Sequence, residues 1–134
     1  GGKDNAILTN TNSDDIELSR SGLSLVAEDG TYLGCWGCGE YDSDSICNQY
    51  GSHGNKYSSA SIWNNYGTYG NKYSIQSPWN KYSSSGPKLV ASNGRIKGRF
   101  SINFFSGFDQ SRKLKSVYET SRGKLTIVRN AVCK

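Results

Sequence analysis

The sequence predicts a mainly β, turn-rich single domain that is stabilised by disulfides. Only 34% of the 134 residues are hydrophobic, so the apolar core is small. The four cysteines form an even set, which is typical of small cross-linked domains. A 16-residue pattern rich in Tyr, Asn, Gly and Ser recurs without gaps through the middle of the chain. Because domains commonly have about this length, we expect one domain over residues 1–134.

Residues 1–22 precede the first apolar run and are predicted to be flexible or loosely packed. The chain begins Gly1-Gly2-Lys3 and contains no methionine, which is typical of a protein whose signal peptide has been removed. No run of 18 apolar residues is present, so no membrane-spanning helix is expected. Together with the Ser/Asn/Tyr/Gly-rich composition, these features predict export to the periplasm or out of the cell.

Two similar β-hairpins are expected, over residues 25–40 and 89–105. The strings LVAEDGTYLG and LVASNGRIKG begin at positions 25 and 89, which are separated by four periods of the repeat. Each string contains an apolar pair, a turn dipeptide (Asp29-Gly30 or Asn93-Gly94) and an extended arm. Asp-Gly and Asn-Gly supply the positive φ angles that tight hairpin turns need.

Between the hairpins, residues 41–88 divide into three 16-residue repeats. They read YDSDSICNQYGSHGNK, YSSASIWNNYGTYGNK and YSIQSPWNKYSSSGPK. Aliphatic residues are too few for long strands, so compact turns are expected, with Asn and Ser side chains bonding to nearby backbone groups. The seventh position holds Cys47, Trp63 or Trp79. A position that accepts either residue type faces inward, so a buried structural role is favoured over ligand stacking for these tryptophans.

The cysteines predict two structural disulfides in an oxidising compartment. Cys35, Cys38, Cys47 and Cys133 allow three pairings, between which the sequence does not choose. A bridge from Cys133 would tie the C-terminus back to the CWGC region and stabilise the fold by about 4 kcal/mol. A catalytic dithiol is disfavoured because no βαβ pattern surrounds CWGC, and a zinc site because Cys133 is far from the other cysteines.

The C-terminal part, residues 106–134, is predicted to form one short helix and a terminal strand. Leu114, Val117 and Tyr118 share one face of a helix over residues 110–121. The string KLTIVRNAVC predicts a strand near 124–129. All four phenylalanines lie between positions 100 and 108, and we expect them in the core rather than in a membrane anchor.

Charge is distributed unevenly along the chain. Residues 1–87 carry 5 Lys/Arg and 9 Asp/Glu, whereas residues 88–134 carry 11 Lys/Arg and 2 Asp/Glu. The basic part either balances charge within the fold or binds an anionic polymer, such as nucleic acid or an acidic envelope polymer. The candidate residues for that binding are Arg95, Lys97, Arg99, Arg112, Lys113 and Lys115.

A second candidate binding surface consists of tyrosine rings and asparagine amides. Tyrosine rings can stack on a ligand and Asn amides can form hydrogen bonds, a combination that suits sugars and protein surfaces. The candidate residues are Tyr50, Tyr66, Tyr69, Tyr82, Asn64 and Asn65. The main hypothesis is therefore an exported, non-enzymatic binding module for an envelope or extracellular glycan or protein.

Enzyme chemistry has little support in the sequence, and no cofactor is predicted. His53 is the only histidine, and neither a nucleophile elbow nor a phosphate-binding glycine loop is present. A small secreted hydrolase or a toxin-neutralising partner is the third hypothesis. Asp42 and Asp44 alternate as Ca²⁺ ligands can, but the full loop pattern is absent, so a solvated acidic turn is expected.

Residues 25–105 resemble a repeat found in small exported bacterial proteins. The resemblance is carried by the strings DSDSI and SIWNNYGTYGNKYS, between the EDGTYLG and SNGRIKG hairpins. The unit of those proteins reads approximately Asn-Pro-Tyr-Gly-x-Tyr-Gly-Ser-x-Tyr-Ser, and this chain has Trp-Asn in place of Asn-Pro. The resemblance implies export and a similar fold unit. It implies no catalytic residue, because the family has no assigned activity.

Overall fold

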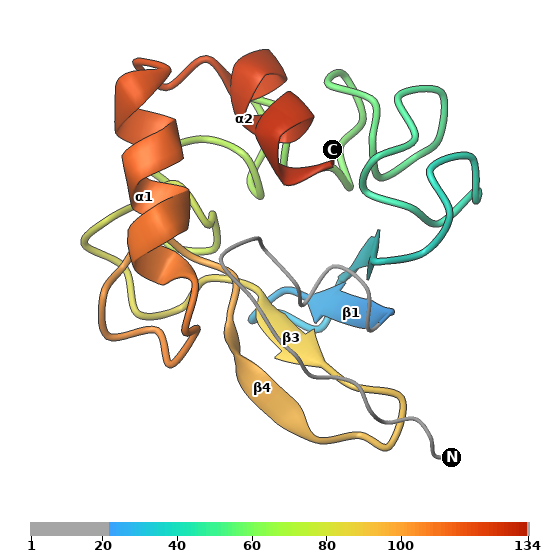
Figure 1. Ribbon diagram of the computed structural model, residues 1–134, viewed down its shortest axis with the longest axis horizontal. Helices are drawn as coiled ribbons and strands as arrows, with labels where there is room; N and C mark the ends of the chain where they lie inside the picture. Colours follow the sequence, from blue (N-terminus) through green and yellow to red (C-terminus); the bar gives the residue numbers. More distant parts are fainter. Residues whose placement is uncertain (1–21, 134) are drawn as a thin grey trace.

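The computed structural model describes residues 22–133 (Figure 1). Its regular elements are β1 (Leu23–Val26), β2 (Tyr32–Trp36), β3 (Lys88–Val90), β4 (Ile96–Arg99), α1 (Ser111–Thr120) and α2 (Leu125–Val132). The small β-rich fold with disulfides is confirmed. The expectation for residues 1–22 lies, apart from Gly22, outside the described residues. Within the described part, no helix is long and apolar enough to cross a membrane.

The four strands form one antiparallel sheet in the order β2-β1-β3-β4. β1 pairs with β2 and β3 with β4, so each pair is a hairpin, and β1 also pairs with β3. At this central pairing Leu25 lies opposite Leu89, and both side chains are fully buried. The two hairpins are therefore joined through the leucines of their LVA strings.

The two hairpin turns are built alike. Ala27 N–H donates to the carbonyl of Thr31 in the first turn, and Ala91 N–H donates to that of Arg95 in the second, each over 2.8 Å. The Asp or Asn of each turn dipeptide accepts the N–H two residues later. The glycines that follow have φ of 91° and 87°, a region that residues with a Cβ avoid. These are the tight turns that the dipeptides predict.

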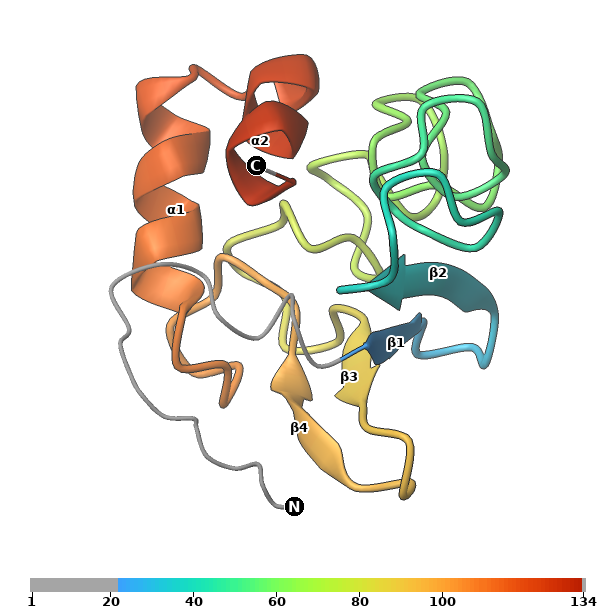
Figure 2. The same ribbon diagram turned by 45° about the vertical axis from the view of Figure 1, so that its right-hand side comes forward.

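Residues 41–87 form stacked loops without strands, part of which overlap at the upper right of Figure 2. The same contacts recur along these loops with the 16-residue period of the sequence. Trp63 donates its indole N–H to the carbonyl of Ile46, and Trp79 donates to that of Ile62, both over 2.7 Å. The two indole rings stack with their centroids 5.6 Å apart. Each loop is thus joined to the one before it through a buried tryptophan.

An asparagine follows the seventh position of each 16-residue segment and uses both ends of its amide within the loop. Its NH₂ group donates to the carbonyl six residues earlier, and its oxygen accepts the N–H two residues later. These contacts satisfy backbone groups that have no strand partner. The residues concerned are Asn48, Asn64 and Asn80.

The core extends from the sheet to the helices through a series of contacts between aromatic rings. Trp36 of β2 contacts Phe100 and Phe108 edge-on, with centroids 5.0 and 5.8 Å away. Phe100 in turn contacts Trp79, and Tyr118 of α1 stacks on Trp79 with the ring centroids 5.4 Å apart. The helix expected over 110–121 is present as α1, and it buries Leu114 under the same rings.

The prediction of a terminal strand near residues 124–129 is wrong, because α2 occupies this stretch. The chain therefore has two C-terminal helices in place of one. The β-branched residues of LTIV favour a strand locally. Burial favours the helix, because Leu125, Val128 and Val132 are all buried and share one helical face. The alternation of a strand that buries Leu125 would instead have turned Arg129 inward.

The two expected disulfides are confirmed, as Cys35–Cys38 and Cys47–Cys133. Cys133 therefore bonds to the first 16-residue segment, and to neither cysteine of CWGC. Cys47 stands where the next two segments have tryptophan. The long-range bridge fastens the end of α2 to the loop stack at that position.

Removing the long-range bridge is expected to destabilise the fold most. The variant C47S/C133S opens a loop with a sequence separation of 86, for which chain entropy predicts a loss of about 4.5 kcal/mol in unfolding free energy. The variant C35S/C38S opens a separation of only 3, worth about 2 kcal/mol. Urea unfolding followed by tryptophan fluorescence measures both losses. A larger loss for C35S/C38S would contradict this account.

Close packing within a loop predicts a second difference in stability. A Cβ on Gly70 would lie 2.1 Å from the carbonyl oxygen of Asn64. Gly70→Ala must therefore displace backbone, and it is expected to cost about 3 kcal/mol of unfolding free energy. Gly39→Ala is the control, since no atom lies within 4 Å of its Cβ, and its effect should stay within about 0.5 kcal/mol. Equal unfolding midpoints in urea would refute the described loop closure.

Candidate functional site

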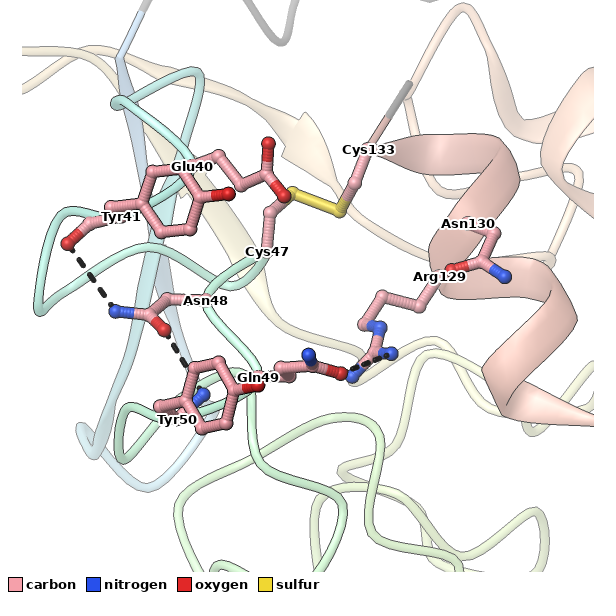
Figure 3. Close-up of a pocket in the computed structure, with 9 residues that line it drawn as sticks. All are labelled: Glu40, Tyr41, Cys47, Asn48, Gln49, Tyr50, Arg129, Asn130 and Cys133. Atoms are coloured by element: carbon pink, nitrogen blue, oxygen red, sulfur yellow. Dashed lines mark hydrogen bonds between the residues drawn. A yellow bond between two sulfur atoms is a disulfide. The ribbon is translucent and has the colours of Figure 1, made fainter.

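A hollow of about 460 Å³ lies beside the first 16-residue segment, against the long-range disulfide. Figure 3 shows the rings of Tyr41 and Tyr50 at its edge. Arg129 of α2 reaches toward the segment, where its guanidinium donates to Gln49 Oε1 over 3.4 Å and to a backbone carbonyl over 3.2 Å. The hollow is therefore formed between one loop and α2.

Two more hollows repeat this arrangement beside the second and third segments, with volumes of about 230 and 870 Å³. Two tyrosines line each of them, Tyr57 and Tyr66 in the second hollow and Tyr73 and Tyr82 in the third. Five positions line all three hollows, each recurring with the 16-residue period. They are 40, 56 and 72; 41, 57 and 73; 47, 63 and 79; 49, 65 and 81; and 50, 66 and 82.

Neighbouring hollows share lining residues. Arg129 lines both the first and the second, and Asn65 and Tyr66 line both the second and the third. α2 forms the opposite wall of the first two hollows, and the end of α1 with the turn after it forms that of the third. We call these three hollows together the tyrosine groove.

The tyrosines of the groove lie on the surface. Each of the six is at least 76% exposed, so their rings do not substitute for an aliphatic core. Exposed aromatic rings in a row are available for stacking on a ligand. The residues are Tyr41, Tyr50, Tyr57, Tyr66, Tyr73 and Tyr82.

Of the residues that the sequence suggested for this surface, Tyr50, Tyr66 and Tyr82 all line the groove. Asn65 also lines it and is exposed. Asn64 does not line it, because its amide is used within the loop and only 9% of the residue is exposed. The two adjacent asparagines thus have different roles.

Tyr69 lies apart from the groove and packs against the core. Its hydroxyl donates to Asp29 Oδ2 over 2.6 Å and lies 2.9 Å from Thr31 Oγ1. The bond from Tyr69 is the main cause that lowers the pKa of Asp29 to about 2, followed by the bond from the Thr31 N–H. The same bond raises the pKa of Tyr69. Tyr69 therefore fastens the second segment to the first hairpin turn.

The six basic candidates do not gather into one patch. Arg95 and Lys97 are exposed on the β3–β4 hairpin, whose tip points away from α1 in Figures 1 and 2. Arg99 pairs with Glu28 at 2.8 Å, and this pairing is the main cause that lowers the pKa of Glu28. Of the three basic candidates on this hairpin, only Arg99 forms an ion pair with another described residue.

The three basic candidates on α1 are also divided. Arg112 and Lys115 lie over the ring of Phe104, 4.9 and 4.6 Å from its centroid. Lys115 also pairs with Glu119 at 3.4 Å. Lys113 is exposed. Part of the positive charge of the C-terminal third is therefore balanced within the fold.

The acidic turn and the histidine have structural contacts. Asp42 Oδ1 accepts the N–H of Asp44 over 2.9 Å, and Tyr32 donates to Asp44 Oδ2 over 3.4 Å. His53 Nδ1 bonds to the carbonyl of Ala60 over 2.9 Å. Across residues 22–133, no group of three His, Cys, Asp or Glu side chains could hold a metal ion.

Residues 101–106 repeat the loop contacts, which the sequence analysis missed. Phe105 N–H donates to Asn103 Oδ1 over 2.8 Å, and Asn103 N–H donates to Ser101 Oγ over 3.0 Å. Phe105 thereby takes the place of the second tyrosine of a segment, and it is 92% exposed. The expectation that all four phenylalanines are buried is wrong for it and for Phe104. The string SINFFS, which matches SIWNNYG with one residue fewer, was the available signal.

The groove also uses residues that sequence reasoning did not select. The first tyrosine of each segment has the same 16-residue period as the second, so its role was detectable. Tyr118, Arg122 and Arg129 also line the groove. Their position depends on how the helices pack against the loops, and no local pattern signals it.

No protein-family model matches this chain, and no curated protein or solved structure matches it either. The resemblance to exported bacterial repeat proteins therefore stays a prediction.

The bond between Tyr69 and Asp29 predicts a pH effect with a definite sign. The folded pKa of Asp29, about 2, lies below its ordinary value of 3.8. Ionised Asp29 therefore favours the folded state above pH 3.8, and this contribution is lost as the pH falls from 3.8 to about 2. In Tyr69→Phe the pKa should rise toward 3.8 but stay below it, because the Thr31 bond remains. An NMR titration that finds the same pKa in both proteins would contradict the assigned bond.

Proposed function

We propose that this protein is an exported, non-enzymatic binding module whose tyrosine groove holds a linear glycan chain. One observation carries the proposal: five positions line three successive hollows, each at 16-residue intervals. Such a row offers the same chemical groups to successive units of a polymer. In this proposal each 16-residue segment is a copy of one structural and binding unit.

The chemistry of the groove supports a sugar ligand. Tyrosine combines an apolar ring face, which can stack on a sugar ring, with a hydroxyl that exchanges hydrogen bonds with sugar hydroxyls. The amides of Gln49 and Asn65 lie between these rings. Polar groups interleaved with aromatic rings are the lining expected of a carbohydrate site.

The spacing and rigidity of the loops support a polymer. Trp63 and Trp79, equivalent residues of consecutive segments, lie 5.6 Å apart between ring centroids, which is close to the length of one sugar unit in an extended chain. Asparagine side chains hold the backbone N–H of five of the six groove tyrosines. Rings on an ordered backbone lose little freedom on binding.

The two disulfides support export, since such bonds persist in oxidising compartments. The basic segment 95–115 is a less suitable ligand surface than the groove. Two of its six cations are already paired, and the β3–β4 tip is turned away from α1. Binding of an anionic polymer is still supported, but by other cations, those that line the groove.

Truncating the exposed rings is expected to weaken glycan binding strongly without unfolding the protein. The variant Y50A/Y66A/Y82A removes one ring from each hollow, and at about 1 kcal/mol per ring the affinity should fall about a hundredfold. A glycan array identifies the ligand, and isothermal titration calorimetry measures the loss. Y69F is the control outside the groove and should bind like the unmodified protein. A Y50A/Y66A/Y82A variant that stays folded and retains full glycan affinity would rule out the groove as the ligand site.

A further inference from the structure

We propose that the third hollow recognises a carboxylate-bearing sugar, so that the polymer in the groove is an acidic polysaccharide. The inference rests on the proposed function. It adds the chemical class of the ligand and names the hollow that selects it.

The charge of the groove changes in one direction along the chain. Apart from the seventh position, which holds Cys47, Trp63 or Trp79, two positions of the lining vary, and they lie directly before the first and the second tyrosine of each segment. The first is occupied in turn by Glu40, Lys56 and Lys72, and the second by Gln49, Asn65 and Lys81. Arg122 adds another cation to the third hollow. The cations that line the three hollows therefore number one, two and three in turn.

The cations of the third hollow are available to a ligand. Lys72, Lys81 and Arg122 are exposed, and none of them forms an ion pair with another residue of the described part of the chain. Glu119, the one carboxylate that lines this hollow, is paired with Lys115 at 3.4 Å. An anion that enters the hollow thus meets three cations without a competing free carboxylate.

These cations lie beside an aromatic platform. Each of the two lysines is 5.3 Å from the centroid of the tyrosine that follows it. Tyr118 and Trp79, which also line this hollow, stack on each other with only 3° between their ring planes. At about 870 Å³ the hollow is the largest of the three. A sugar that stacks on the exposed tyrosine rings would bring the carboxylate attached to it within reach of the cations.

The distribution of charge favours an acidic polysaccharide over single-stranded nucleic acid. Nucleic acid carries a phosphate at every unit, and its binding grooves follow the backbone with positive charge. Here the first hollow contains Glu40, and its guanidinium, from Arg129, is already bonded to the loop. A polymer with carboxylates on only some of its units matches a groove whose cations are most numerous in the third hollow.

The test compares one polymer with and without its charge. The probes are polygalacturonate with half of its carboxyls methyl-esterified and the fully esterified polymer, with poly-dT as the nucleic-acid competitor. The unmodified protein should bind the half-esterified form about tenfold more tightly. The variant K72Q/K81Q/R122Q should lose this preference and retain its affinity for the full ester. Calorimetry at one fixed salt concentration measures each affinity.

The matched control is R95Q/K97Q/K113Q, which removes the same amount of charge from exposed sites outside the groove and should keep the tenfold preference. Equal losses in the two variants, no preference in the unmodified protein, or tighter binding of poly-dT would each overturn the inference. If Y50A/Y66A/Y82A loses both polymers while K72Q/K81Q/R122Q keeps the preference for the half-esterified form, the groove is the ligand site and the assignment of carboxylate recognition to the third hollow is wrong. If Y50A/Y66A/Y82A binds both polymers normally, the proposed function itself fails.

Discussion

The buried indole that bonds each loop to the one before it is the contact on which this structure depends. Apart from one isolated bridge between Ser45 and Cys35, residues 41–87 have no strand pairing. Their backbone groups therefore need other partners, and their loops need another means of stacking. Trp63 and Trp79 supply both, because each donates its N–H to the carbonyl 17 residues earlier while its ring is buried. A buried hydrogen bond contributes about 1 kcal/mol and burial of a large ring several more. Cys47 has the same position, and its disulfide replaces the ring with a covalent tie to α2.

The inward-facing seventh residue of each segment also determines where the exposed tyrosine three residues later lies. The asparagine after it closes a turn with both ends of its amide, and the tyrosine two residues further on donates its N–H to that side chain. The turn points the tyrosine ring away from the core, where it is exposed in every segment. Each repeating segment therefore contributes both to a buried stack and to an exposed row. Because both come from one period, the row is as regular as the stack.

The features that follow from local chemistry could be predicted from the sequence. The Asp-Gly and Asn-Gly turns, the two disulfides and helix α1 each depend on a few adjacent residues or on a simple count. The remaining features of the fold and of the groove depend on tertiary contacts. Helix α2 forms in spite of its β-branched residues because Leu125, Val128 and Val132 are buried together. Asn64 and Asn65 look alike in the sequence, and only their hydrogen bonds separate the structural residue from the exposed one. No local sequence pattern indicates which helix residues form the opposite wall of the groove.

The variable positions of the groove are the ones that the fold leaves free. The tyrosines, the buried seventh position and the asparagine after it are all held by contacts within the loops. The residues just before each tyrosine are exposed, and their internal contacts are limited to cation–π pairs and one long bond between Gln49 and Arg129. Exposed charges of this kind change stability by less than about 1 kcal/mol. A change from Glu40 to Lys72 at equivalent positions therefore has little bearing on folding, and in the proposed mode of binding it changes the charge that a ligand meets in each hollow.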